Sequence, residues 1–231
     1  MEFIDRENEI LKTIKRMVDA GLDLVVVGGY AVSSLARHRF SVDCDIVVPR
    51  KELEDFGSIL EKEGFIKHVE RSGFDEIYAG EFVSYKKEVA GLPVTVDLLV
   101  ESLVCRATQA AWSFEYVKRH SMEANIPSTE ASVSCRVPEK ELLIAFKIHS
   151  ARRADVRDAV MLRENAGFEK VLKHLRKGNI EALKDQIKKV IAALEDKNLV
   201  HSLKGVFTLT ADVKKQIEST RKDMEAILKA V

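Results

Sequence analysis

Residues 25–48, VVVGGYAVSSLARHRFSVDCDIVV, decide the fold. A short apolar run stops at Gly28-Gly29, and a segment rich in small residues follows, which is typical of a short helix. A second apolar run then opens with Asp43 and Asp45. Alternate residues of a strand point to the same face, so these two carboxylates should share one. The stretch therefore predicts a strand, a turn, a helix and a second strand with an acidic face.

A third carboxylate, Asp97, lies inside a later β-like run, VTVDLLVE at 94–101. A charge in the middle of a strand needs a partner. Three strand-borne carboxylates together would suit one or two Mg²⁺ ions, which prefer hard oxygen ligands. The plainer alternatives are a solvated strand start for Asp43 and Asp45, and a local ion pair or an exposed edge strand for Asp97.

The glycine pair has a phosphate-binding interpretation as well as an ordinary one. Gly28-Gly29 lets the backbone adopt positive φ and approach a ligand closely, and exposed N–H groups before a helix attract phosphate. Arg39 and Ser41, just before Asp43, can donate hydrogen bonds to phosphate oxygens. The alternatives are a tight turn and a surface arginine. The sequence contains neither G-x-G-x-x-G nor G-x-x-x-x-G-K-[ST], which argues against Rossmann and P-loop sites.

Lys147 is the other anomalous residue. It lies in LLIAFKI (142–148), which is apolar on nearly every side of a helix. Its ammonium must extend to the surface or face an anion, such as a phosphate or an internal carboxylate. The charged run 152–158, which contains Arg153, follows directly and has a plain interpretation as a solvated corner between helices.

Composition limits the class of protein. The chain has 231 residues, 46% of them apolar, with 37 Lys and Arg against 37 Asp and Glu. Zero net charge does not favour wholesale binding of nucleic acid, although a local basic patch remains allowed. Three widely spaced cysteines show no zinc-ligand spacing. Residues 1–5 show no basic segment followed by an apolar stretch, so a signal peptide is not expected. No apolar run approaches the roughly 20 residues that a membrane span needs, and a cytoplasmic location is expected.

The expected fold class is α/β (α+β), with a mixed sheet and flanking helices followed by an all-helical C-terminal domain. We expect an α/β domain at 1–136 and a helical domain at 137–231, because the β signal ends near Pro138. The expected strands are 24–27, 44–48, 65–69, 76–78, 82–86 and 94–100. The expected helices are 5–20, 30–38, 51–62, 139–152, 155–164, 168–177, 180–194 and 211–231, the last capped by Thr210.

These motifs resemble a known family. Gly28-Gly29 followed by Asp43-x-Asp45 and a later Asp97 is similar to the polymerase-β-like nucleotidyltransferase superfamily, and most closely to AbiEii-type and related small prokaryotic members. RFSVDCD at 39–45 resembles their R-x-S-x-D-h-D run. ELLIAFK at 141–147, with Arg153, Asp155 and Asp158 after it, resembles their downstream helical signature. The resemblance covers residues 22–165; the helices after Phe168 match nothing known.

The resemblance implies a metal-dependent nucleotidyltransferase that moves a nucleoside monophosphate from an NTP such as ATP to a hydroxyl. Asp43, Asp45 and Asp97 would be the catalytic residues and would hold two Mg²⁺ ions, with Mn²⁺ as a substitute, about 3.5–4 Å apart. Asp97 would lie nearest the attacking oxygen and act as the base. The nucleotide-binding residues would be Gly28, Gly29, Arg39, Ser41, Lys147 and Arg153.

The acceptor stays open at this point: a tRNA, a protein and a small molecule all fit. The helical half would complete the cleft and select it. The alternative function is a non-catalytic nucleotide-binding module of the same fold, or a partner in a toxin–antitoxin pair. Retention of all three aspartates favours the enzyme.

Overall fold

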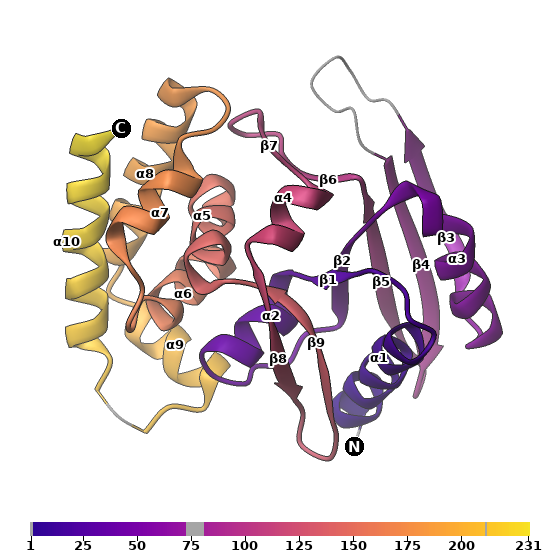
Figure 1. The fold of residues 1–231 in the computed structure, drawn as a ribbon. Coiled ribbons are helices and arrows are strands. Elements are labelled where there is room, and N and C mark those ends of the chain that lie inside the picture. Colours follow the sequence, from indigo (N-terminus) through magenta and orange to yellow (C-terminus); the bar gives the residue numbers. More distant parts are fainter. Residues whose placement is uncertain (1, 73–80, 211) are drawn as a thin grey trace. The chain divides into compact units, whose positions relative to one another are not determined.

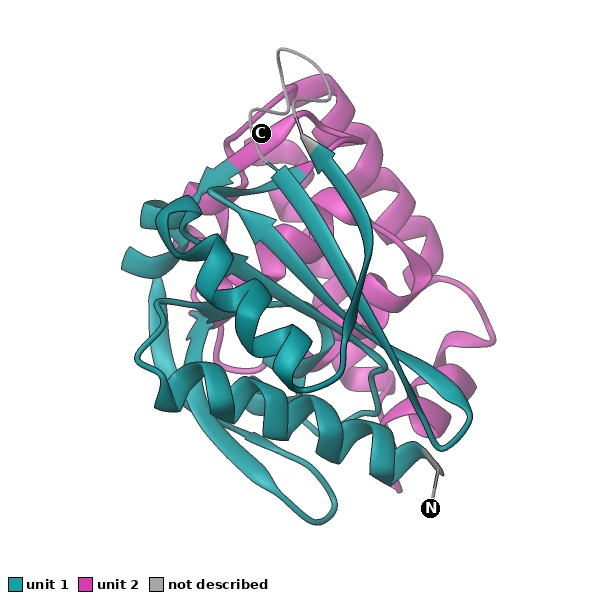
Figure 2. Ribbon diagram, turned by 90° about the vertical axis from the view of Figure 1, so that its right-hand side faces the viewer, with its two compact units in different colours: residues 1–104, 112–138 teal, residues 105–111, 139–231 magenta. Residues whose placement is uncertain are grey.

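A computed structural model describes residues 2–72, 81–210 and 212–231 of the chain. The chain forms two compact units, coloured separately in Figure 2. Unit 1 comprises Met1–Val104 and Trp112–Pro138, and unit 2 comprises Cys105–Ala111 and Glu139–Val231. Each unit has its own apolar core and is described by itself.

A five-stranded mixed sheet forms the centre of unit 1 (Figure 1). Its spatial order is β1-β2-β5-β4-β3, and β2 and β5 are the parallel pair. The other neighbours are antiparallel. The strands are β1 (Val25–Val26), β2 (Asp43–Val48), β3 (Ile66–Ser72), β4 (Glu81–Val89) and β5 (Leu92–Val100).

Two helices, α1 (Glu2–Asp19) and α3 (Leu53–Lys62), pack on one face of this sheet (Figure 2). Alternate residues of β4 meet them there. An ideal Cβ at Gly57 of α3 would lie 2.8 Å from the Tyr85 hydroxyl, and Lys87 Nζ lies 2.7 Å from Glu9 Oε1 of α1. Strand alternation therefore places Ser84, between Tyr85 and Val83, on the opposite face.

The remaining elements of unit 1 connect to this frame. The short α2 (Gly28–Leu35) joins β1 to β2, and the turn η1 (Arg50–Glu52) precedes α3. After the sheet come α4 (Phe114–Arg119) and the hairpin of β8 (Ser121–Pro127) and β9 (Ser132–Pro138). A second hairpin, β6 (Ser102–Cys105) with β7 (Ala110–Ser113), takes the chain from unit 1 into unit 2 and back.

Unit 2 is a helical bundle plus the tip of that second hairpin. The helices are α5 (Lys140–Ser150), α6 (Arg153–Leu162), α7 (Phe168–Leu175), α8 (Ile180–Leu194), α9 (Leu199–Phe207) and α10 (Lys214–Ala230). Every residue of α5 from Leu142 to His149 is buried, because α6, α7 and α8 all pack against it. This explains why the sequence of α5 is apolar on nearly every side.

The structure confirms the expected fold class of a mixed sheet with flanking helices and a helical C-terminal region. Of the expected strands, 76–78 lies outside the described residues. The strands after residue 100, α4 and α9 were not predicted. The last helix begins at Lys214 with Val213 as its N-cap, so the predicted cap at Thr210 is wrong. None of the helices in the described part of the chain combines the length and apolar character of a membrane span.

Candidate active site

The candidate site is built on the parallel pair of strands in unit 1. Asp45 of β2 is the register partner of Asp97 of β5, and Asp43 is the partner of Thr95. Register partners on adjacent strands point to the same face, with their backbones roughly 4.8 Å apart. The three aspartates therefore lie side by side on one face of the sheet, as three positions of a small acidic platform.

This platform lies on the face away from α1 and α3. Asp97 is also the register partner of Ser84 in β4, while its neighbours Val96 and Leu98 pair with Tyr85 and Val83 on the helix-covered face. Burial alternates accordingly, with Val96 and Leu98 buried and Asp97 half-buried. The apolar residues that flank the aspartates thus bury one face of the sheet while the carboxylates emerge on the other.

Asp97 has the most perturbed environment of the three. Its Oδ1 accepts a hydrogen bond of 2.6 Å from the Ser84 hydroxyl. Burial raises the pKa of Asp97 to about 6, the Ser84 hydrogen bond lowers it, and the charges of Asp45 and Asp43 raise it further. A carboxyl with a pKa close to neutrality is suited to accept a proton in catalysis.

Two hydroxyl residues that support the platform were not singled out in the sequence. The Thr95 hydroxyl donates to Asp43 Oδ1 at 2.8 Å, in the same way as Ser84 donates to Asp97. Thr95 could have been found, because it lies two residues before Asp97 and so shares its strand face. Ser84 could not, since its place beside Asp97 depends on the register of two antiparallel strands.

The glycine pair lies directly against the platform. Gly28 has φ of +65°, and an ideal Cβ there would lie only 2.3 Å from Asp45 Oδ2. A Cβ at Gly29 would lie 2.8 Å from Ser41 Oγ and 3.0 Å from Arg39 Nη2. The backbone of α2's first turn therefore approaches the side chains of Asp45, Ser41 and Arg39 as closely as only glycine permits.

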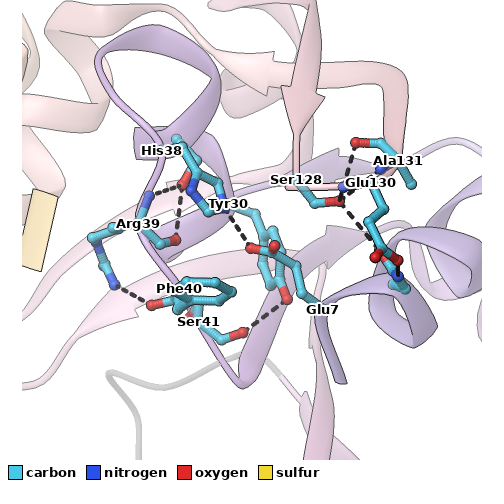
Figure 3. Close-up of polar contacts among 11 residues, drawn as sticks. Glu7, Tyr30, His38, Arg39, Phe40, Ser41, Ser128, Glu130 and Ala131 are labelled. Atoms are coloured by element: carbon cyan, nitrogen blue, oxygen red, sulfur yellow. Dashed lines mark hydrogen bonds and ion pairs between the residues drawn. The ribbon is translucent and has the colours of Figure 1, made fainter. Parts of the chain in front are cut away.

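Buried side chains hold the loop between α2 and β2, which contains Arg39 and Ser41 (Figure 3). The hydroxyl of Tyr30, a buried residue of α2, donates to the Ser41 carbonyl at 2.9 Å. The Arg39 N–H donates to Ser33 Oγ at 3.2 Å. His38 Nε2 lies 2.8 Å from Oε1 of the buried Glu7. The loop is thus fixed to α1 and α2 while the Arg39 and Ser41 side chains lie beside Gly29.

Lys147 and Arg153 belong to unit 2. Lys147 is buried, and its Nζ lies 3.1 Å from Asp155 Oδ1 and 2.8 Å from Asp158 Oδ2. Of the two kinds of anionic partner considered for Lys147, the structure shows the internal carboxylates. Arg153 is almost fully exposed and contacts Asp196 at 3.4 Å. Phosphate binding by these two residues stays a prediction.

The donor set of the platform fits a divalent metal. Asp43 and Asp97 each use Oδ1 for a hydroxyl hydrogen bond, which orients the carboxylate and leaves Oδ2 for coordination. Three carboxylates at adjacent positions also repel one another, and the charges of Asp45 and Asp43 add to burial in raising the pKa of Asp97. A bound cation would remove this repulsion, and oxygen ligands of this type are those that Mg²⁺ and Mn²⁺ prefer.

Comparison with known proteins supports the fold. Neither a family model nor a curated protein sequence matches the chain. The structure of JHP933 from Helicobacter pylori superposes with a TM-score of 0.54 at 15% identity, covering 97% of this chain and 91% of that one. ANT(2″)-Ia in complex with adenylyl-2″-tobramycin reaches 0.49 at 18% identity, covering 77% and 95%. The lincosamide antibiotic adenylyltransferase LnuA, lincomycin-bound, reaches 0.48 at 18% identity, covering 69% and 98%.

The likeness to JHP933 extends over nearly the whole length of both chains. The chain therefore has the polymerase-β-like nucleotidyltransferase fold, and the resemblance inferred from its motifs is confirmed at the level of the fold.

Proposed function

We propose that this protein is a metal-dependent nucleotidyltransferase that transfers a nucleoside monophosphate from an NTP to a hydroxyl group. The observation that supports this most directly is the register of β2 and β5. It places Asp45 beside Asp97, and Asp43 two residues away on the same face. A carboxylate platform next to a glycine turn combines the two elements that the reaction needs, which are a site for cations and a backbone for phosphate.

Asp43, Asp45 and Asp97 would hold two Mg²⁺ ions, which supply charge stabilisation at the triphosphate and lower the pKa of the acceptor hydroxyl. Asp97 would accept the proton of that hydroxyl, because the resemblance places it nearest the attacking oxygen. The acceptor oxygen forms a bond to the α-phosphorus, and the bond from that phosphorus to the bridging oxygen of pyrophosphate breaks. The products are the nucleotidylated acceptor and pyrophosphate.

The phosphates would lie against the first turn of α2. Ser41 and Arg39 lie beside Gly29 and offer a hydroxyl and a guanidinium to phosphate oxygens. Little covalent chemistry is asked of the protein, because positioning and charge stabilisation dominate such transfers. Lys147 and Arg153 are included as phosphate-binding residues on the motif resemblance alone.

The test is incubation of the purified protein with Mg²⁺ and each labelled NTP, with total tRNA and cell lysate as sources of acceptor. Pyrophosphate release that EDTA abolishes, together with label on an acceptor, is the expected result. NTP binding that is unaffected by EDTA, without any release, would instead identify the non-catalytic nucleotide-binding alternative. A toxin–antitoxin role needs a partner protein that suppresses the same release.

A further inference from the structure

The zero net charge of the chain conceals an opposite charge on each unit. Unit 2 holds 21 of the 37 Lys and Arg residues but only 14 of the 37 Asp and Glu residues, so its formal net charge is +7. Unit 1 holds 16 and 23, giving −7. A helical unit of 100 residues with this excess attracts polyanions, of which nucleic acids are one class.

Much of this positive charge is not neutralised locally. Among the described residues, seven lysines of unit 2 have neither an ion pair nor a side-chain hydrogen bond. All are exposed except Lys204, which is half-buried. They are distributed over α7, α8, α9, α10 and the turn after α8, and are Lys173, Lys189, Lys197, Lys204, Lys214, Lys215 and Lys229.

Unit 2 also contains a cavity of about 190 Å³ whose lining joins charged and polar side chains to the apolar Val156, Ala193 and Leu199. Two arginines one helical turn apart on α6, Arg153 and Arg157, line one side. The Asn198 and Ser202 side chains at the start of α9 line the other, and Arg157 Nη1 lies 2.7 Å from Ser202 Oγ. The space would hold about six waters, which is ample for one phosphate group.

One carboxylate, Asp196, also lines this cavity. Its Oδ1 accepts the Asn198 N–H at 2.9 Å, and its Oδ2 makes the 3.4 Å contact with Arg153. This distance is long for a charge-assisted bond, and the Arg153 side chain is 90% exposed. Arg153 is therefore available to an incoming anion, and a phosphate would compete with a weakly held internal carboxylate.

We propose that unit 2 binds the sugar–phosphate backbone of a nucleic acid, with one phosphate in the Arg153–Arg157 cavity and further phosphates at exposed lysines of the set named above. The inference rests on the proposed function and deepens it, because it makes the acceptor a nucleic acid with a terminal hydroxyl. A small neutral or cationic acceptor would make no use of a unit with a charge of +7. Single-stranded RNA offers both the phosphates and the hydroxyl.

The test measures the anisotropy of a labelled single-stranded RNA of about 20 nucleotides against the full chain between about 50 and 200 mM salt. The affinity should fall steeply with salt. In a plot of the logarithm of the binding constant against the logarithm of the salt concentration, a variant that makes one phosphate interaction fewer should have a slope shallower by about 0.7. Arg157→Gln should remove about one such interaction, and the Lys189→Gln/Lys197→Gln pair about two. The matched control is Lys62→Gln/Arg119→Gln, which removes two exposed positive charges of unit 1 that have no ion pair with any described residue. This control should change nothing.

The results that would overturn the proposal are equally concrete. They are a lack of RNA binding at the lowest salt concentration, equal weakening by the unit 1 control, or binding of a polyglutamate of the same length as tight as that of RNA. Tripolyphosphate that displaces RNA at equal concentration would show a site for free phosphate anions only. Measuring the Mg²⁺-dependent thermal shift by NTP on the same samples separates this failure from failure of the proposed activity, since that shift needs no acceptor.

Discussion

Asp45 and Asp97 are register partners on the two parallel strands of the sheet, so their carboxylates occupy adjacent positions on the face away from α1 and α3. Two acids at this spacing repel each other unless a cation lies between them. Burial is the largest cause of the raised pKa of Asp97, and this pairing explains why the charge of Asp45 raises it further. The pairing also gives the site a direct experimental signature in the metal-free protein.

Asp43→Ala and Asp45→Ala should each abolish nucleotidyl transfer and leave the fold intact. Both side chains lie on the face of the sheet away from α1 and α3, and removing either one lessens the charge repulsion on Asp97. The metal-free variants should therefore be as stable as the wild type or slightly more stable. Pyrophosphate release and melting temperature are the measurements. Asp19→Ala, which removes an exposed acid paired with Lys15, is the control and should retain activity. Full activity in either site variant would falsify the metal platform.

Asp97→Asn should separate binding from chemistry. The change retains the shape and one oxygen of the side chain but removes the charge that accepts the acceptor's proton. NTP affinity should fall modestly, while turnover should fall by on the order of 10² or more. Equal losses in affinity and turnover would reduce Asp97 to a metal ligand.

The same variant tests the pH dependence of stability without any substrate. Asp97 titrates near its ordinary 3.8 in the unfolded chain and near 6 in the folded one. Between these values the folded chain holds more of this proton, so the contribution of Asp97 to metal-free stability should fall as the pH rises from about 4 to 6. The side chain that Asp97→Asn introduces does not titrate. The melting temperature of the variant minus that of the wild type should therefore increase with pH over that range and stay constant above it. A difference that is constant with pH would show that Asp97 is not perturbed.

The acidic face could be predicted from the sequence because it depends only on patterns within single strands. The alternation of a strand places Asp43 and Asp45 together, and a charge among valines and leucines marks Asp97. The contribution of Ser84 depends on pairing between β4 and β5, which no local pattern encodes. The two short hairpins escaped prediction for a related reason, since strands of four to seven residues with polar alternation resemble loops.

The partners of Lys147 show the same limit on the helical side. The apolar surroundings of this lysine predicted that it faces an anion, but both phosphate and carboxylate fitted the pattern. Asp155 and Asp158 lie one helix later, and only the packing of α5 against α6 brings them to the ammonium. Likewise, the charge of each unit could be counted only after the structure had assigned residues 105–111 to unit 2.

Gly28→Ala should damage the site more than the fold. The positive φ of Gly28 costs an alanine about 1–2 kcal/mol, and the new methyl would push the Asp45 carboxylate from its position. Gly21→Ala is a matched control, because Gly21 has φ of +75° but nothing within 4 Å of its ideal Cβ. The melting temperature should fall by a similar amount in the two variants. Only Gly28→Ala should lose the thermal shift by Mg²⁺ and NTP, and retention of that shift would remove Gly28 from the site.

His149 should make unit 2 sensitive to acid. It is fully buried, with Nδ1 2.7 Å from the Thr108 hydroxyl and Nε2 3.1 Å from the Leu175 carbonyl. Burial lowers the pKa of His149 from 6.5 to about 4. At this group the unfolded chain therefore binds more protons between these values, so the contribution of His149 to stability should be lost as the pH falls from about 6.5 to 4, opposite in sign to that of Asp97. In the His149→Gln variant, the free energy of unfolding should depend less on pH in this range. An unchanged pH dependence would show that other residues cause the acid sensitivity.

Lys147→Met decides whether this lysine supports the fold, the nucleotide or both. Methionine keeps the unbranched stem but leaves Asp155 and Asp158, both buried, without the ammonium between them. Breaking a buried pair on one side typically costs about 3–5 kcal/mol. We therefore expect a large fall in melting temperature, with NTP affinity barely changed if the two carboxylates are the only partners.

The triple variant Lys147→Met/Asp155→Asn/Asp158→Asn is the internal control for that experiment. It removes the uncompensated charges together with the lysine, so much of the lost stability should return. Asp155 also accepts hydrogen bonds from Arg152 at the start of α6, so recovery should be incomplete. If the triple variant recovers its melting temperature but binds NTP about ten-fold or more weakly, the lysine contributes to phosphate binding as well. If affinity is unchanged in both variants, Lys147 is a structural residue and the phosphate-binding set is smaller than the motif implies.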